Sequence, residues 1–151
     1  MNPDFIDMLS ALSEARVDFL IVGAHALAAH GVPRATGDLD IWIRPTPDNA
    51  ARALRALVAF GAPLAGLTVD DLTRPDTVFQ IGLPPARIDI LSGITGVSFA
   101  DAWDRRVAVR LTAGEVAVLS KQDFIANKTA VGRPKDLADM ALLDEADGLD
   151  R

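Results

Sequence analysis

The chain contains no cysteine. Neither a disulfide framework nor a thiolate metal site is available, so oxygen atoms are the metal ligands that remain in quantity.

Long apolar runs are also missing. No stretch approaches the roughly 20 apolar residues of a membrane span, and residues 1–5 lack the basic region of a secretion signal. We therefore expect a soluble cytoplasmic protein that does not associate with membranes.

Basic residues are scarcer than acidic ones. The chain has 15 Lys and Arg against 21 Asp and Glu, which gives a formal net charge of −6 at pH 7. Such a balance disfavours non-specific nucleic-acid binding over the whole surface, but it permits a local basic patch. Basic residues cluster at 105–106 and at 121–135. Each cluster has an alternative interpretation as the solvated face of a helix.

The composition is typical of one globular domain. A chain of 151 residues, half of them hydrophobic and 24% charged, is long enough to bury one core and too short for two comfortable ones. We find no internal repeat, low-complexity tract or linker. We therefore predict a single domain over residues 1–151.

Apolar periodicity and cap residues predict an α/β (α+β) fold with a mixed sheet flanked by helices. We expect helices over residues 4–14, 24–30, 48–60 and 99–105, a helical turn near 69–72, and a C-terminal helix pair that begins at 120 and restarts after Pro134 over 135–143. We expect strands over residues 17–22, 38–43, 78–83, 87–91, 107–111 and 115–119, with 78–91 as an antiparallel hairpin and 107–111 at an edge. Trp42 and Trp103 are expected in the core rather than as platforms for base stacking.

Two carboxylates, Asp38 and Asp40, open the strand expected over 38–43. Positions i and i+2 of a strand face the same way, so both side chains project together. Like charges this close repel, and buried carboxylates lose hydration, but a bound divalent cation removes both penalties. The pair therefore predicts a metal site.

Two further features fit phosphoryl chemistry at this site. Asp89 is a lone acid within an apolar strand, and Gly23 ends a strand where a helix begins. Three carboxylates can serve a two-metal phosphoryl site, and a glycine at a helix N-terminus lets backbone N–H groups approach phosphate closely.

At these residues the chain resembles the nucleotidyltransferase superfamily of the DNA polymerase β type. That family has an apolar residue, Gly, then Gly or Ser, a spacer, an Asp-apolar-Asp or Asp-apolar-Glu strand, and a third acid on a later strand. The chain is similar in particular to small prokaryotic members related to the AbiEii-type toxin nucleotidyltransferases, through residues 34–40 and a C-terminal stretch from Lys128 to Asp139. The resemblance covers roughly residues 17–143 and implies a minimal nucleotidyltransferase fold.

The resemblance also implies an activity. The chain would transfer a nucleoside monophosphate from a nucleoside triphosphate to a hydroxyl group of RNA, protein or a small molecule, with Mg²⁺ or Mn²⁺. Asp38 and Asp40 would ligate the metals, and Asp89 would complete the second metal site and help to deprotonate the attacking hydroxyl. The residues expected at the nucleotide are Gly23, Ala24, His25, Thr36, Lys128, Arg133 and Lys135. Expected partners are the nucleoside triphosphate and a hydroxyl acceptor, for which tRNA and protein are candidates, with a partner chain or a second copy of the chain as a means of completing the site. A second hypothesis is that the same chemistry serves a growth-inhibiting toxin that an antitoxin partner restrains.

Several alternatives stay open. Ala24 stands where family members often have Ser or Gly, and the chain leaves little room for a separate substrate domain. The alternative function is therefore a catalytically degenerate module that binds a nucleotide or a partner. Asp89 could instead form a structural ion pair with Arg87, and Gly23 could be only a strand-ending turn.

Overall fold

The computed structural model describes residues 1–32 and 37–149. Over these residues the chain forms seven helices: α1 (Pro3–Glu14), α2 (Gly23–Ala29), α3 (Pro47–Phe60), α4 (Val69–Thr73), α5 (Phe99–Asp104), α6 (Lys121–Val131) and α7 (Pro134–Leu149). The strands are β1 (Phe19–Val22), β2 (Leu39–Ile43), β3 (Val78–Ile81), β4 (Ile88–Leu91), β5 (Val107–Leu111) and β6 (Gly114–Val118). The predicted α/β class, with its C-terminal helix pair, is confirmed.

The strands form one mixed sheet in the order β3-β4-β2-β1-β6-β5. β1 is antiparallel to β2 and parallel to β6, while β2 is parallel to β4. The predicted hairpin is confirmed as the antiparallel pair β3 and β4, and β5 is an edge strand, as its alternating pattern predicts. This order places β2 between β4 and β1, so the acids at its start lie near the middle of the sheet.

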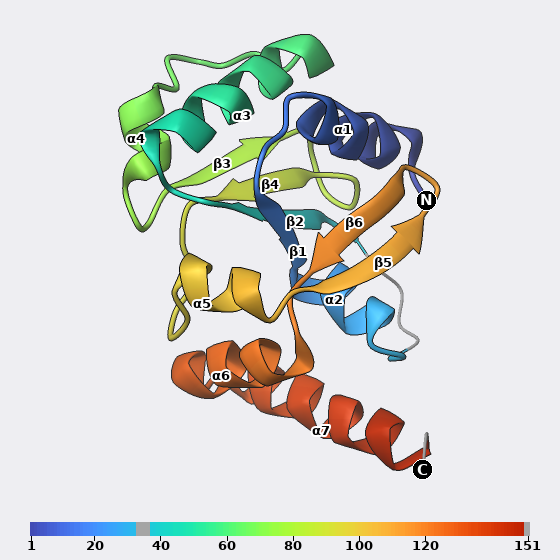
Figure 1. The fold of residues 1–151 in the computed structure, drawn as a ribbon. Coiled ribbons are helices and arrows are strands. Elements are labelled where there is room, and N and C mark those ends of the chain that lie inside the picture. Colours follow the sequence, from blue (N-terminus) through green and yellow to red (C-terminus); the bar gives the residue numbers. More distant parts are fainter. Residues whose placement is uncertain (33–36, 150–151) are drawn as a thin grey trace.

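Helices cover the sheet on both sides (Figure 1). In that view α1, α3 and α4 lie above the sheet, and α5, α6 and α7 lie below it. All four residues of β1 are buried, and Trp42 of β2 is 1% exposed. The expected core position of Trp42 is therefore confirmed, whereas Trp103 is only partly buried.

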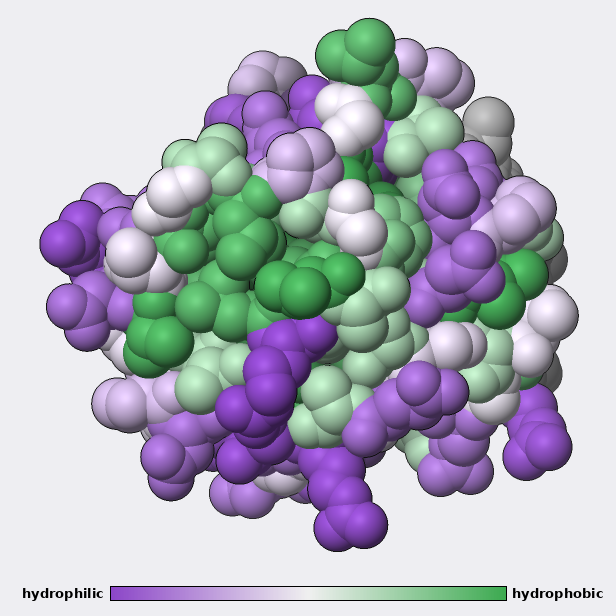
Figure 2. All heavy atoms as spheres, turned by 90° about the horizontal axis from the view of Figure 1, so that it is seen from above, coloured by the Kyte–Doolittle hydropathy of each residue, from purple (hydrophilic) through white to green (hydrophobic). Residues whose placement is uncertain are grey.

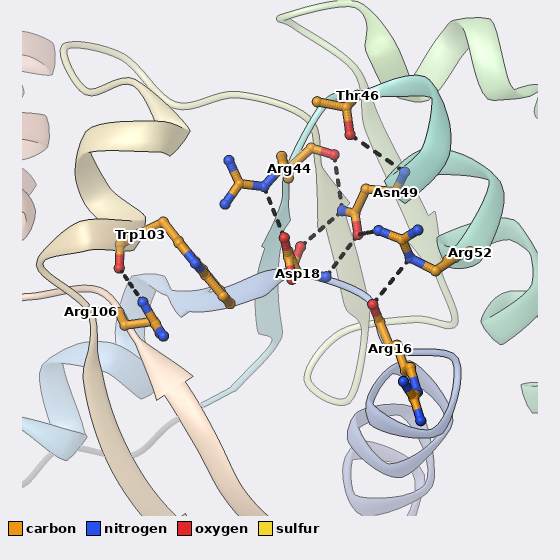
Figure 3. A network of polar contacts seen from close by, with 8 residues as sticks. All are labelled: Arg16, Asp18, Arg44, Thr46, Asn49, Arg52, Trp103 and Arg106. Carbon is orange, nitrogen blue, oxygen red and sulfur yellow. Dashed lines mark hydrogen bonds and ion pairs between the residues drawn. The ribbon is translucent and has the colours of Figure 1, made fainter.

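A buried asparagine ties β1 and β2 together at the end away from the acids (Figure 3). Asn49 of α3 accepts a hydrogen bond from the Asp18 backbone N–H at 2.8 Å, and its Nδ2 donates to the carbonyl oxygens of Asp18 and Arg44, both at 3.0 Å. Asn49 is fully buried, so these bonds satisfy polar groups that water cannot reach. The contacts fix the start of β1 against the end of β2.

The outer surface of the α1, α3 and α4 layer is partly apolar. Val58 of α3 is 61% exposed, and Figure 2, which views the molecule from above, shows hydrophobic side chains gathered in a patch bordered by hydrophilic ones.

Within the part of the chain that the structure describes, no helix has both the length and the apolar composition that a membrane crossing requires.

Candidate functional site

The sheet brings the three predicted acids together. In the parallel pair of β2 and β4, Asp40 lies directly opposite Asp89. Asp38 precedes β2 by one residue and lines the same cleft as the other two. The acidic cluster, Asp38, Asp40 and Asp89, joins two acids that are two residues apart with a third that follows Asp40 by 49 residues. The register of β2 and β4 makes Asp89 a neighbour of Asp40.

Burial and crowding make the ionised form of Asp40 costly. Loss of hydration, followed by the nearby charge of Asp89, a side-chain hydrogen bond with Asp89 and the charge of Asp38, raises the pKa of Asp40 to about 6. Lys128 acts in the opposite direction and lowers the pKa. The ionised form of Asp40 is therefore disfavoured by burial and by the neighbouring acids, and a bound cation would relieve that penalty.

Gly23 is required at its position because Asp40 leaves no room for a side chain. Its φ of +67° lies in the left-handed region that favours glycine, and an added Cβ would overlap the Asp40 Oδ2 atom. Val22, the residue before it, pairs with Asp40 across β1 and β2. The absence of a side chain at Gly23 therefore allows the start of α2 to lie against the acidic cluster.

Arg87 bridges two of the three acids. Its Nε donates to Asp89 Oδ1 at 2.8 Å, and its Nη2 lies 3.2 Å from both Asp89 Oδ2 and Asp38 Oδ2. The Arg87 backbone N–H also donates to Asp38 Oδ1 at 3.0 Å. The ion pair between Asp89 and Arg87, considered from the sequence as an alternative to a metal site, is therefore present. Arg87 is not among the site residues predicted from the sequence, although in the strand expected over 87–91 it shares a face with Asp89.

The C-terminal helix pair contributes a cationic side to the site. Arg133 donates to the fully buried Asp136 through Nε at 2.8 Å and Nη2 at 3.2 Å, and Lys128 Nζ lies 3.3 Å from Asp136 Oδ1. The Arg133 hydrogen bonds, assisted by Lys128, hold the pKa of Asp136 well below its usual range. Gly132, with a φ of +70°, ends α6 and turns the chain into α7. Asp136 thus fixes Lys128 and Arg133 beside the acids.

Acidic and basic groups share one cleft of about 380 Å³. Its lining combines small, acidic and basic residues: Gly23, Ala24, Gly37, Asp38, Asp40, Arg87, Asp89, Lys128, Arg133, Lys135 and Asp139. Gly37 and Asp139 are not among the site residues predicted from the sequence. Asp139 is buried on α7 three residues after Asp136, and this spacing on one helix face was the available signal.

One residue expected at the nucleotide, His25, lies outside the cleft lining. The His25 imidazole packs edge-on against Phe5, and its Nε2 lies 3.3 Å from the Gly37 carbonyl oxygen. Burial lowers the pKa of His25, and the residue is not part of the cleft lining. Thr36 lies outside the described residues. Ala24 lines the cleft as expected.

The donor set suits a hard divalent cation. Within residues 1–32 and 37–149, no group of three or more His, Asp or Glu side chains is arranged so that it could hold a metal ion. The acidic cluster nevertheless offers only carboxylate oxygens, which Mg²⁺ and Mn²⁺ prefer, and its mutual repulsion is what such a cation offsets. In the structure, Arg87 supplies the positive charge beside Asp38 and Asp89.

The cleft therefore combines a carboxylate cluster on the sheet with anchored cations on the helix pair, an arrangement suited to a metal-bound polyphosphate.

No family model matches the chain, and no curated protein matches it.

Proposed function

We propose that the chain is a metal-dependent nucleotidyltransferase that transfers a nucleoside monophosphate from a nucleoside triphosphate to a hydroxyl acceptor. One observation carries the proposal. Asp40 and Asp89 lie in register on adjacent parallel strands, and the cleft that they line is lined also by Lys128, Arg133 and Lys135 of the helix pair. Neither the acidic cluster nor the basic residues alone suggest nucleotidyl transfer. Together they complement a metal-bound triphosphate, because the acids can bind the metal and the basic residues can bind the phosphates.

The acidic cluster would hold the cation. When bound, a divalent cation would neutralise charge on the α-phosphate and on the leaving pyrophosphate. With a pKa of about 6, Asp40 is mostly ionised at neutral pH and so is available as a ligand. Asp89 would accept the proton of the attacking hydroxyl at one of its carboxylate oxygens once Arg87 has moved from it.

The cationic residues would orient the triphosphate. The planar guanidinium of Arg133 suits two phosphate oxygens, and Lys128 acts as a compact point charge. Because both are anchored to the buried Asp136, they would hold the phosphates without first having to become ordered. Lys135 is exposed, lines the same cleft, and can contact the outer phosphates.

A second candidate is a catalytically degenerate module that binds nucleotide without turnover. The observation that favours it is Arg87, which contacts two of the three carboxylates that the reaction needs. If the cation cannot displace Arg87, the helix pair would still bind phosphate, but nucleotidyl transfer would not occur. A role as a growth-inhibiting toxin with an antitoxin partner stays a prediction of the resemblance.

The test measures binding and turnover separately. The full chain is incubated with labelled nucleoside triphosphates, Mg²⁺ or Mn²⁺, and tRNA, protein or small hydroxyl acceptors. We expect label transfer and pyrophosphate release, both reduced at least about 100-fold by Asp40→Asn or Asp38→Asn. Asp7→Asn, on the exposed surface of α1, is the matched control.

The possible outcomes separate the two candidates. Calorimetric binding of triphosphate, with no pyrophosphate released from it in the presence of any acceptor, would favour the binding module. Absence of both binding and transfer would overturn both candidates. If expression of the chain stops growth and Asp38→Asn restores it, the toxin role gains support.

A further inference from the structure

We infer that two copies of the chain associate through β3, the two β3 strands pairing antiparallel so that both sheets join into one. The inference goes beyond nucleotidyl transfer and does not depend on it. It follows from the unpaired side of β3, from the residue types over 77–83, and from the position of Gln80 relative to the acidic cluster.

One side of β3 carries backbone groups that point away from the sheet. β3 is the last strand of the sheet order and has β4 as its neighbour. The Ser92 backbone N–H donates to the Thr77 carbonyl oxygen at 3.1 Å, and hydrogen-bonded pairs recur at every second residue of an antiparallel pair. The backbone groups of Val78 and Gln80 therefore face outward. Among residues 1–32 and 37–149, none forms a hydrogen bond with them.

Charge does not protect this edge of the sheet. Residues 77–83 contain no Asp, Glu, Lys, Arg or Pro. Natural sheet edges commonly carry charged residues, prolines or bulges, which prevent pairing with another strand. The opposite edge follows that rule, because Arg110 lies within β5 and Arg105 and Arg106 come shortly before it. Of the two edges, β3 is therefore the one suited to an additional strand.

Apolar side chains lie along the same segment. Val78 is 54% exposed, and Leu83, which follows the strand, is 81% exposed. Phe79 and Ile81 share the other face of the strand and are only partly buried against the core. A strand added beside β3 would remove more of this apolar surface from water, and such burial is the main favourable term in most protein association.

The segment is complementary to a second copy of itself. In a two-fold antiparallel pair centred on Gln80, this residue lies opposite Gln80 of the second copy, and Phe79 lies opposite Ile81 of the second copy. The outward backbone groups of Val78 and Gln80 then gain hydrogen-bond partners, and no charges within 77–83 oppose the approach. A two-fold pair also covers both copies of the edge at once and closes the assembly.

The pairing would bring the acidic clusters of two copies onto one face. Gln80 lies directly opposite Asp89, and Asp89 lies directly opposite Asp40. Directly opposed residues face the same side of a sheet, so these three side chains form one row that leads to the edge. Across the two-fold axis the row continues in reverse order. The two Asp89 backbones would be three strand spacings apart, which is roughly 14 Å.

Sedimentation equilibrium of the full chain tests the association. We expect a dimer with a dissociation constant of about 10 µM or lower. Gln80→Lys places like charges opposite each other at the two-fold axis and should weaken the dimer at least about tenfold. Ala108→Lys, on the exposed surface of the opposite edge strand, is the matched control and should leave the constant unchanged. A wild-type chain that stays monomeric at about 100 µM, or a dimer that Gln80→Lys does not weaken, would overturn the inference.

A mixture of charged variants checks that Gln80 meets its own copy. Gln80→Lys and Gln80→Glu should each be largely monomeric, because like charges then face each other. An equimolar mixture should dimerise again, because opposite charges face each other across the axis. A mixture that stays monomeric while the wild type dimerises would show that the two positions are not opposed, and would overturn the inference.

A cross-link tests the register directly. The chain has no cysteine, so Gln80→Cys introduces a single thiol. Opposed Cα atoms of a hydrogen-bonded pair lie about 5.5 Å apart, which is within the range that a disulfide spans. We expect mild oxidation to cross-link Gln80→Cys into a covalent dimer and to leave Ala108→Cys monomeric on a denaturing gel. Equal cross-linking of the two variants, or none in either, would overturn the inference.

Discussion

The Arg87 guanidinium meets the Asp89 carboxylate through two hydrogen bonds, Nε to Oδ1 at 2.8 Å and Nη2 to Oδ2 at 3.2 Å. Because the same group also reaches Asp38, one arginine pairs with two acids that a cation would also need. Arg87 and a divalent cation should therefore compete for the acidic cluster.

Replacing Arg87 by Gln should strengthen cation binding. The variant loses the competing charge, so we expect Mn²⁺ affinity, measured by electron paramagnetic resonance, to rise at least about tenfold. Without divalent cation the variant should melt at a lower temperature, since the repulsion among the acids is then unrelieved, and added Mg²⁺ should restore the melting temperature. Arg74→Gln, which removes an exposed ion pair with Asp71, should change neither quantity. Equal or weaker Mn²⁺ binding by Arg87→Gln would show that the arginine does not compete with the cation.

Asp40 should make stability fall as the pH rises. Since its folded pKa of about 6 lies above the ordinary value of 3.8, the folded state holds the Asp40 proton more tightly than the unfolded state. The resulting penalty is absent below about pH 4, grows between pH 4 and 6, and is complete at pH 7. Asp40→Asn should therefore raise the free energy of unfolding by roughly 1–3 kcal/mol at pH 7 and by much less near pH 4.

Urea unfolding at the two pH values, without divalent cation, measures this difference. Asp7→Asn serves as the exposed control and should give equal effects at both values. Saturating Mg²⁺ should stabilise the wild type and leave Asp40→Asn nearly unchanged. A variant less stable than the wild type at pH 7 would contradict the electrostatic account.

Gly23→Ala should disturb the site beyond the cost of its backbone conformation. An alanine in the left-handed region costs roughly 1–2 kcal/mol at either Gly23 or Gly61, where φ is +67° and +95° respectively. Only at Gly23 would the new Cβ collide, and there with Asp40. We expect both variants to lose stability in chemical denaturation and Gly23→Ala alone to lose Mn²⁺ binding. Unchanged Mn²⁺ affinity in Gly23→Ala would mean that Asp40 does not contribute to the cation site.

Asn49→Ala should destabilise the sheet strongly, because it removes the hydrogen-bond partner of the Asp18 backbone N–H and of the Arg44 carbonyl oxygen. The Asp18 carbonyl oxygen loses one of two hydrogen bonds and keeps the one from the Arg44 backbone N–H at 3.1 Å. We expect a loss of roughly 2–4 kcal/mol in the free energy of unfolding. The matched control is Asn127→Ala, which removes one exposed hydrogen bond to Thr95 and should cost about 1 kcal/mol or less. Comparable losses in the two variants would contradict the structural role of Asn49.

Much of the fold could be predicted because its signals are local. Ser120 accepts a hydrogen bond from the Asp123 backbone N–H as the N-cap of α6, and Gly61 ends α3 in the left-handed conformation. Both are short-range rules that residue type alone reveals. Asp38 and Asp40 could be found for the same reason, since the two-residue repeat of a strand sets their common face.

The remainder of the site depends on contacts between distant segments. The bridge from Arg87 to Asp38 exists only because β2 and β4 pair in one particular register, which periodicity does not specify. Asn49 offers no sequence signal, since its partners lie on two different strand ends. Asp139 is buried on α7, and the spacing from Asp136 alone does not predict that burial, because it depends on how α7 packs.

The helix pair has a consequence for chemical labelling. Every lysine of the chain, Lys121, Lys128 and Lys135, belongs to α6 or α7. An amine-acylating reagent would thus modify this region and the N-terminal amine while leaving the sheet unmodified. Lys128 and Lys135 line the cleft, whereas Lys121 is not among the lining residues. Bound polyphosphate would slow acylation of the first two relative to the third, so peptide mass spectrometry could report occupancy from one stretch of chain.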